Sequence, residues 1–429
     1  MTRIVLLTWG SHGDVVPFVA LAKALQAAGY GVALGAQPYH AEFIRRYGIE
    51  FLALGGETSA ERYKQLMEAL VLEANPRKQM RALLHEMLLP DLDGQYQDSL
   101  SAVRDADLVI AHWMQLAGMM AAETLHKPCV TVSLNPVGIS VVADTVPAAN
   151  AAARNLGKML SDYIWGDEFH RFRERHDLPP IESVADYQYS KQMNLVAVSG
   201  ALLPERVSFE AQHKVTGFWS LQDEQPWTPT PELEAFLAVP EKPVVITFGS
   251  MGGRAEEMTA IVAEAVHQAG CRAILQGGWA GLGAAGIDGP DGAGRNILRV
   301  DYVPHEYLFR HAACVVHHGG AGTTSAALRA GVPSVIVWYM LDQPYWGNLL
   351  ARLDLGAKPL QRLGLTAAAL AARINETLAN PGYRTNCAQV AQQIIGEHGP
   401  ENAVQEIKVF LKQMCRQTES FVDDAKPSA

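Results

Sequence analysis

A strand–turn–helix pattern sets the architecture of this chain, and it reads Val315-Val316-His317-His318-Gly319-Gly320-Ala321-Gly322-Thr323-Thr324. The apolar residues predict a strand, and the glycine-rich turn leads into a predicted helix over Ser325–Ala330. Free backbone N–H groups and the positive end of the helix dipole meet at such a turn, so the pattern predicts an anion site. The alternative is an ordinary tight turn with a packed histidine.

A similar sequence motif occurs near the start of each half of the chain. Thr8-Trp9-Gly10-Ser11-His12-Gly13 is echoed by Thr247-Phe248-Gly249-Ser250-Met251-Gly252. Each copy follows an apolar run and precedes a helical pattern that ends in Ala-Gly. Strands that alternate with helices in this way predict α/β units with a parallel sheet. The repeat therefore predicts two Rossmann-like, doubly wound domains.

Proline content places the boundary between these domains. Five prolines fall between residues 226 and 243, and proline is excluded from helix interiors and central strands. We expect a first domain over 1–220, a linker over 221–243 with a short helix near Glu232–Leu237, and a second domain over 244–416. The last helix is a candidate to pack back on the first domain, and residues 417–429 are expected to fray.

Composition restricts the class of protein. Of 429 residues, 48% are hydrophobic and 19% charged, which excludes wholesale disorder. A net charge of −10 disfavours nucleic acid as a partner. Five cysteines without a CxxC pair disfavour a disulfide framework or a zinc site and fit a cytoplasmic protein. We expect no transmembrane segment, while peripheral membrane contact stays open.

Three other motifs were weighed and set aside. Gly281–Gly286 satisfies the GxGxxG expression but leads into Ile287-Asp288-Gly289-Pro290 rather than a helix, so a flexible loop is expected. The pairs Asp91/Asp93 and Asp105/Asp107 resemble DxD metal motifs, yet helix caps or solvated faces explain them more simply. We therefore expect no metal and no cofactor.

The glycine-rich segment, together with its flanks, resembles the nucleotide-sugar signature of a large family of inverting glycosyltransferases. That family includes plant UDP-glycosyltransferases and sterol, glycopeptide and rhamnolipid transferases. The resemblance runs from Tyr302-Val303-Pro304-His305 to Asp342-Gln343-Pro344, and Gly10–Phe18 looks like the opening of the sterol, glycopeptide and rhamnolipid branches. It implies the α/β fold called GT-B, in which two Rossmann-like domains face across a cleft. The donor would lie in the C-terminal domain and the acceptor mainly in the N-terminal one.

The resemblance also implies roles for individual residues. Tyr302 and Val303 would hold the base, Asp342 and Gln343 the sugar hydroxyls, and Asp14 would be the catalytic base. The diphosphate would be held by His318, Gly320, Gly322, Thr323, Thr324 and Ser250. Two departures from the plant pattern are Ala326 in place of the ribose-binding glutamate and Ala321 in place of a tryptophan, so ribose recognition must come from elsewhere.

The chemistry of sugar transfer favours an arrangement in which a carboxylate faces the anion site. An acceptor hydroxyl must lose a proton as it attacks the sugar, and Asp14 suits that task once cleft closure raises its pKa. An N-cap for the following helix is the alternative role for Asp14. His12 is a second candidate base or a loop histidine, and His112 either lines the cleft or is structural.

The partners follow from these roles. We expect a nucleotide diphosphate sugar as donor, with UDP-glucose favoured over a dTDP-sugar. Flexible apolar side chains suggest a lipophilic acceptor, although plain core is the alternative at helical spacing; they are Met67, Leu70, Met80, Leu83, Leu84, Met87, Leu88, Leu89, Met119 and Met120. Other readings are a sugar-nucleotide epimerase, a rhamnosyltransferase acting on a hydroxy-fatty-acyl lipid, and a non-catalytic binding module.

Overall fold

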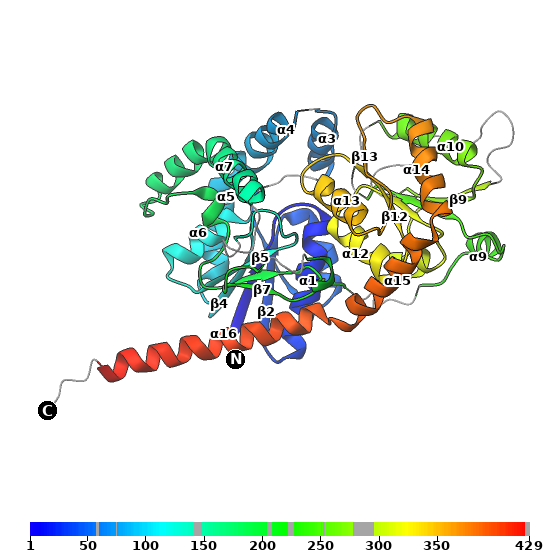
Figure 1. The fold of residues 1–429 in the computed structure, drawn as a ribbon. Coiled ribbons are helices and arrows are strands. Elements are labelled where there is room, and N and C mark those ends of the chain that lie inside the picture. Colours follow the sequence, from blue (N-terminus) through cyan, green and yellow to red (C-terminus); the bar gives the residue numbers. More distant parts are fainter. Residues whose placement is uncertain are drawn as a thin grey trace.

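The computed structural model describes residues 1–56, 60–73, 75–140, 148–203, 208–221, 227–249, 251, 254–277 and 296–424. Within these ranges the strands form two parallel sheets, one in each half of the chain (Figure 1). None of the helices in these ranges has an apolar stretch that could cross a membrane.

The N-terminal sheet has the strand order β3-β2-β1-β4-β5-β6-β7. Alternate residues of its central strand β1 enter two different cores, Ile4 and Leu6 on one face and Val5 and Leu7 on the other, and all four are fully buried. Burial on both faces explains the continuous apolar run in the sequence. The strands are β1 Arg3–Leu7, β2 Gly31–Ala36, β3 Glu50–Ala53, β4 Leu108–His112, β5 Cys129–Ser133, β6 Asn194–Val196 and β7 His213–Val215.

Helices cover this sheet. Two long helical insertions lie between its strands: α3, α4 and α5 fall between β3 and β4, and α7 falls between β5 and β6. The helical segments are α1 His12–Ala27, η1 Pro38–His40, α2 Ala41–Arg46, α3 Ala60–Val71, α4 Pro76–Ala82, η2 Leu83–Leu88, η3 Leu89–Asp91, α5 Leu92–Val103, α6 Leu116–Thr124, α7 Ala148–Arg175, α8 Val184–Tyr187 and η5 Gly200–Leu202.

The C-terminal sheet repeats the arrangement with the order β10-β9-β8-β11-β12-β13. Its strands are β8 Val244–Thr247, β9 Ala273–Gln276, β10 Ile297–Val300, β11 Val315–His317, β12 Ser334–Trp338 and β13 Leu360–Gln361. Its helices are α10 Ala255–Ala269, α11 His305–Arg310, α12 Ala321–Arg329, α13 Gln343–Arg352, α14 Ala367–Ala379 and α15 Pro381–Gly396, and α9 Pro231–Leu237 forms the short helix predicted in the linker.

Strand order creates a switch point in each sheet. Connections run outward in opposite directions from the neighbouring pair β1 and β4, and likewise from the pair β8 and β11. Ligands of open α/β sheets bind beyond the carboxyl ends of strands at such points. The two echoed glycine turns follow β1 and β8, and the His318 turn follows β11, so all three lie where ligand binding is expected.

The last helix connects the two halves. α16 Gly399–Asp424 leaves the C-terminal half, packs against α1, and runs beneath the N-terminal sheet (Figure 1). Ala403, Val404 and Ile407 belong to the same core as β1. Just before the helix, Glu397 Oε1 accepts hydrogen bonds from Ser199 Oγ at 2.7 Å and Gly200 N at 2.9 Å.

Two helix boundaries differ from the prediction. α12 begins at Ala321 rather than Ser325, because extended Gly320 is its N-cap, so Gly322, Thr323 and Thr324 lie in its first turn. α16 extends to Asp424, past the domain end expected at residue 416.

The start of α16 provides a test of the packing between the halves. A Cβ on Gly399 would overlap the carbonyl of Phe218, whereas a Cβ on Gly396 would meet no heavy atom within 4 Å. We predict that Gly399→Ala lowers the free energy of unfolding by about 1–3 kcal/mol. Gly396→Ala should leave it unchanged or slightly higher. Urea denaturation of both variants checks this, and equal stability of the two would contradict the packing described.

Candidate functional site

The Asp14 carboxylate is held by the turn that begins α1. Ser11 is the N-cap, and its backbone N–H and Oγ–H donate to Asp14 Oδ2 at 2.7 and 2.8 Å. Asp14 is therefore the third residue of the helix, in a capping box, rather than the N-cap itself. Because Oδ2 is engaged in these bonds, Oδ1 is the oxygen left to face the space beyond the sheet.

The turn before Asp14 is fixed by a second layer of contacts. Gly10 has φ +124°, and a Cβ there would lie 2.5 Å from Asp14 Oδ2, so only glycine fits. Its carbonyl oxygen lies 3.0 Å from the donating Tyr39 hydroxyl and 3.1 Å from His40 Nε2. These contacts hold the backbone that positions the carboxylate.

The surroundings of Asp14 make it a better base than an ordinary aspartate. Burial raises its pKa to about 6, and the negative charge of Asp342 adds to this, while the hydrogen bonds from Ser11 oppose it. Its side chain still exposes 33% of its surface. A carboxylate with this pKa is ionised at pH 7 and close to the pH at which base catalysis is efficient.

His112 is the histidine that approaches Asp14. It ends β4, beside β1, and its Nε2 lies 3.9 Å from Asp14 Oδ1. The side chain is 2% exposed, neither ring nitrogen has a hydrogen-bond partner, and burial lowers its pKa to about 3, so it is neutral at pH 7. His12, by contrast, packs edge-on against Phe43 at 4.3 Å, where burial also lowers its pKa.

His318 is wedged between two glycine turns. A Cβ on Gly249 would lie 3.1 Å from His318 Cε1, and one on Gly320 would overlap the ring nitrogen Nε2. The two turns thus form a slot that holds the imidazole. Burial and neighbouring His305 lower the pKa of His318 to about 4, so it is a neutral ring at pH 7.

Unpaired polar groups gather where α12 begins. His318 Nδ1, Thr324 Oγ1 and Ser325 Oγ are buried and have no hydrogen-bond partner. The first N–H groups of a helix also lack partners within the helix. Buried polar groups normally find partners, and leaving one unpaired costs about 1–3 kcal/mol. The cluster therefore fits a bound anion that these groups would hydrogen-bond, as the sequence predicted.

Other predicted donor residues lie in the segments that follow β10 and β12. Tyr302 is 63% exposed, while Val303 is buried and its carbonyl accepts from Gln276 Nε2 at 3.0 Å. Asp342 Oδ2 accepts from Trp346 Nε1 at 3.0 Å, and burial raises the pKa of the Asp342 carboxyl. Asp342 occupies the N-cap position of α13, yet its side chain makes no capping bond.

Gln343 fixes the loop that precedes α13. It is 4% exposed, and its Oε1 accepts from Tyr339 N at 2.7 Å and Met340 N at 3.1 Å. Its Nε2 donates to Met251 Sδ. The amide thus ties the end of β12 to the second glycine turn. Ser250, predicted to contact the phosphate, lies outside the described residues.

The apolar side chains suggested for acceptor binding pack mainly in the protein core. Met67, Leu70, Leu83, Leu84, Leu88, Met119 and Met120 are all buried in one cluster against the N-terminal sheet. Met80, Met87 and Leu89 are partly buried against it. The core alternative accounts for most of these residues.

The DxD aspartates serve structural roles. Asp91 Oδ2 accepts from Gly56 N at 2.7 Å, and Asp107 Oδ2 accepts from Arg3 N at 2.7 Å. Asp93 pairs with Arg175 and His176. Among the described residues, no three His, Cys, Asp or Glu side chains come close enough to hold a metal. Gly281–Gly286 lies outside the described part of the chain.

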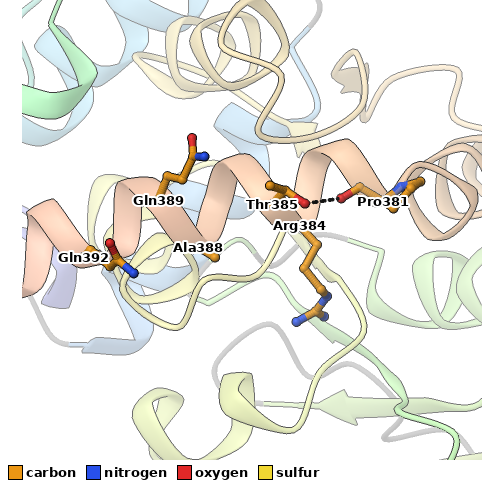
Figure 2. Close-up of a pocket in the computed structure, with 6 residues that line it drawn as sticks. All are labelled: Pro381, Arg384, Thr385, Ala388, Gln389 and Gln392. Atoms are coloured by element: carbon orange, nitrogen blue, oxygen red, sulfur yellow. Dashed lines mark hydrogen bonds between the residues drawn. The ribbon is translucent and has the colours of Figure 1, made fainter.

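A separate surface pocket of about 490 Å³ lies along α15, lined by Pro381, Arg384, Thr385, Ala388, Gln389 and Gln392 (Figure 2). Arg384 Nη2 donates to the carbonyls of Ala312 and Ala313, both at 2.8 Å, and Thr385 Oγ1 donates to Pro381 O. The pocket includes none of the predicted site residues.

Gly322 offers a test of the anion site. A Cβ on this residue meets no atom within 4 Å, and the residue lies in the first turn of α12. We predict that Gly322→Ala keeps or raises thermal stability, because alanine favours a helix, but weakens UDP binding about tenfold by placing a methyl group where the diphosphate approaches. Calorimetry measures the affinity, with Gly396→Ala as the matched helical control. Unchanged UDP affinity would contradict the site.

Comparisons with known proteins agree with this architecture. Residues 4–142 match the family described as the glycosyltransferase family 28 N-terminal domain. Residues 291–410 match the erythromycin biosynthesis protein CIII-like C-terminal domain. The residues between the two matches, 143–290, contain β6 and β7 of the first sheet and β8 and β9 of the second.

Relatives match nearly the whole chain. It is 32% identical to an O-mycaminosyltylonolide 6-deoxyallosyltransferase of Streptomyces fradiae, over 94% of this chain and 96% of that one. A sterol 3-beta-glucosyltransferase of Arabidopsis thaliana is 30% identical over 98% of this chain and 67% of its own.

A solved glycosyltransferase structure shares the fold. The kitacinnamycin enzyme superposes with a TM-score of 0.72 at 18% identity, covering 95% of this chain and 98% of that one. The predicted GT-B architecture is confirmed. The chain therefore belongs to the GT-B glycosyltransferase family, and it is a glycosyltransferase.

Proposed function

We propose that this enzyme transfers a hexose from a nucleotide diphosphate sugar, UDP-glucose ahead of a dTDP-sugar, to a hydroxyl group of a lipophilic small molecule with inversion. The observation that carries the proposal is a group of buried polar atoms without hydrogen-bond partners at the start of α12, which would bind the diphosphate: His318 Nδ1, Thr324 Oγ1 and Ser325 Oγ. The charge of Asp342, in the C-terminal half, raises the pKa of Asp14, which supports a base that acts opposite this anion site.

Asp14 would act as the general base. Its Oδ1 would take the proton from the acceptor hydroxyl while that oxygen attacks the anomeric carbon. The bond between this carbon and the diphosphate oxygen breaks, and its electron pair leaves with the diphosphate. General-base assistance of this kind is worth about 10²–10⁴-fold in rate.

The start of α12 would stabilise the leaving group. Negative charge grows on the diphosphate during bond breaking, and fixed N–H and hydroxyl donors stabilise such charge without reorganising. His318 would donate as a neutral ring to a phosphate oxygen. A bound diphosphate would in turn favour protonation of the ring, because a nearby negative charge raises the pKa of a histidine.

His112 and Asp342 would orient the reacting groups. With a proton on Nε2, His112 would hydrogen-bond Asp14 Oδ1 after a small closing movement, since their present separation of 3.9 Å is slightly too long. Gln343 is engaged with the backbone, so we assign it the positioning of the loop and assign Asp342 the contact with sugar hydroxyls.

The acceptor class rests on the relatives and on the aromatic wall near Asp14. By their names, the two enzymes given above act on O-mycaminosyltylonolide and on a sterol. The rings of Tyr39 and Tyr63 lie tilted against each other with centroids 5.6 Å apart, and the charge of Asp14 raises the pKa of both hydroxyls. A screen of UDP-glucose and dTDP-sugars against cholesterol, O-mycaminosyltylonolide and simple sugars tests this assignment. Transfer to simple sugars alone would contradict it.

The pH dependence follows from the pKa of Asp14. The base must be ionised, so kcat/KM should rise about tenfold between pH 5 and pH 7 and then level off, reflecting a group of pKa about 6. Asp14→Asn should lower kcat by about 10²–10⁴-fold and remove this rise. Asp93→Asn, at an exposed ion pair, serves as the control. A profile in Asp14→Asn that matches the parent enzyme would refute this role.

The affinity for UDP tests whether His318 contacts the donor. His318→Ala should weaken UDP binding about ten- to a hundredfold, the loss expected for one hydrogen bond to a charged group. His12→Ala should leave UDP affinity unchanged, because His12 packs against Phe43 in the other half. The shift of the melting temperature on UDP addition reports both affinities. Equal shifts in the two variants would show that His318 does not contact the donor.

A further inference from the structure

The backbone of Leu341 adopts a conformation that leucine disfavours. Its φ is +55°, in the left-handed region, which costs an ordinary L-residue about 1–2 kcal/mol. The other non-glycine residues of the described chain with positive φ are all polar or charged and sit next to helix ends; they are His126, Asp177, Arg254, Asp354 and His398. Asparagine, aspartate and histidine tolerate this region better than leucine.

Packing does not compensate for this strain. The Leu341 side chain is 49% exposed, so much of its apolar surface faces solvent. Its neighbours, Met340 at 2% and Tyr339 at 4%, are buried. A strained backbone that presents an apolar side chain to solvent gives no gain in stability, and such strain is concentrated at functional sites.

Contacts on both sides of Leu341 place it at the interface between the halves. On one side the Tyr339 carbonyl accepts from Gln79 Nε2 of α4 at 3.4 Å. On the other side, the Asn135 side chain, which follows β5, lowers the pKa of Asp342, and the charge of Asp342 raises the pKa of Asp14. Leu341 therefore lies between a residue bonded to the acceptor half and a residue whose charge acts on the carboxylate that would activate the acceptor.

The loop that carries Leu341 is rigidly held. Gln343 accepts from the N–H groups of Tyr339 and Met340, directly before Leu341. Trp346 donates to Asp342, directly after it. These bonds hold the residues on both sides of Leu341.

We propose that Leu341 is the contact by which the C-terminal domain selects the acceptor. It would pack against the apolar ring system of a lipophilic alcohol beside the hydroxyl that reacts. This inference rests on the function proposed above, and it adds a specificity residue from the domain that otherwise holds the donor.

The proposal predicts that substitutions at Leu341 change acceptor binding without lowering stability. With UDP-glucose saturating, Leu341→Gly should raise KM about tenfold for cholesterol or O-mycaminosyltylonolide, whichever the parent enzyme glucosylates better, because about half a leucine side chain is lost from the contact. Its melting temperature should not fall, because glycine relieves the backbone strain. Leu341→Met, which keeps a similar apolar volume, should retain the parent KM.

Asp354→Gly is the matched control. Asp354 has φ +52°, similar to Leu341, and follows α13 away from the residues assigned to the reaction. The Asp354→Gly variant should likewise keep or raise the melting temperature, and its KM for the acceptor should equal that of the parent enzyme. An unchanged KM in Leu341→Gly, or a fall in melting temperature with no KM effect, would overturn the proposal. Failure of the parent enzyme to glucosylate either alcohol would refute the proposed function itself.

Discussion

The site depends on where parallel strands end. All strands of a parallel sheet point their carboxyl ends to one edge, and the turns at the two switch points meet there. One turn places the Asp14 carboxylate beside His112, and the other places the start of α12 beside His318. In the proposed mechanism, sheet topology thus supplies both the base and the anion site.

The start of α12 sacrifices stability for geometry. Buried polar atoms of His318, Thr324 and Ser325 lack hydrogen-bond partners, and leaving such atoms unpaired destabilises a protein unless a ligand pairs with them. Glycines make the geometry possible, because Gly10 and Gly249 adopt positive φ in the turns after β1 and β8. Elsewhere in the core, Asn194 shows the usual arrangement, in which a buried polar group is hydrogen-bonded.

Local patterns in the sequence were enough to predict the two-domain α/β fold and its strand–turn–helix units, because apolar runs and glycine turns depend on nearby residues; the anion site stays a prediction. Other features depend on distant residues. His112 matters because β4 lies beside β1, and Gln343 points inward because β12 ends beside the Met251 turn. The methionines of the insertions proved to be core. The positive φ of Leu341 could not be predicted from the sequence, because leucine rarely adopts this backbone conformation.

A crystal structure with bound UDP tests the account most directly. We predict that the β-phosphate lies within hydrogen-bond distance of His318 and of the Thr324 hydroxyl, at the start of α12, with Asp14 facing it from the N-terminal half. The opposite result would be a diphosphate bound elsewhere, with the groups at α12 still unpaired. That placement would contradict both the donor site and the role of Asp14.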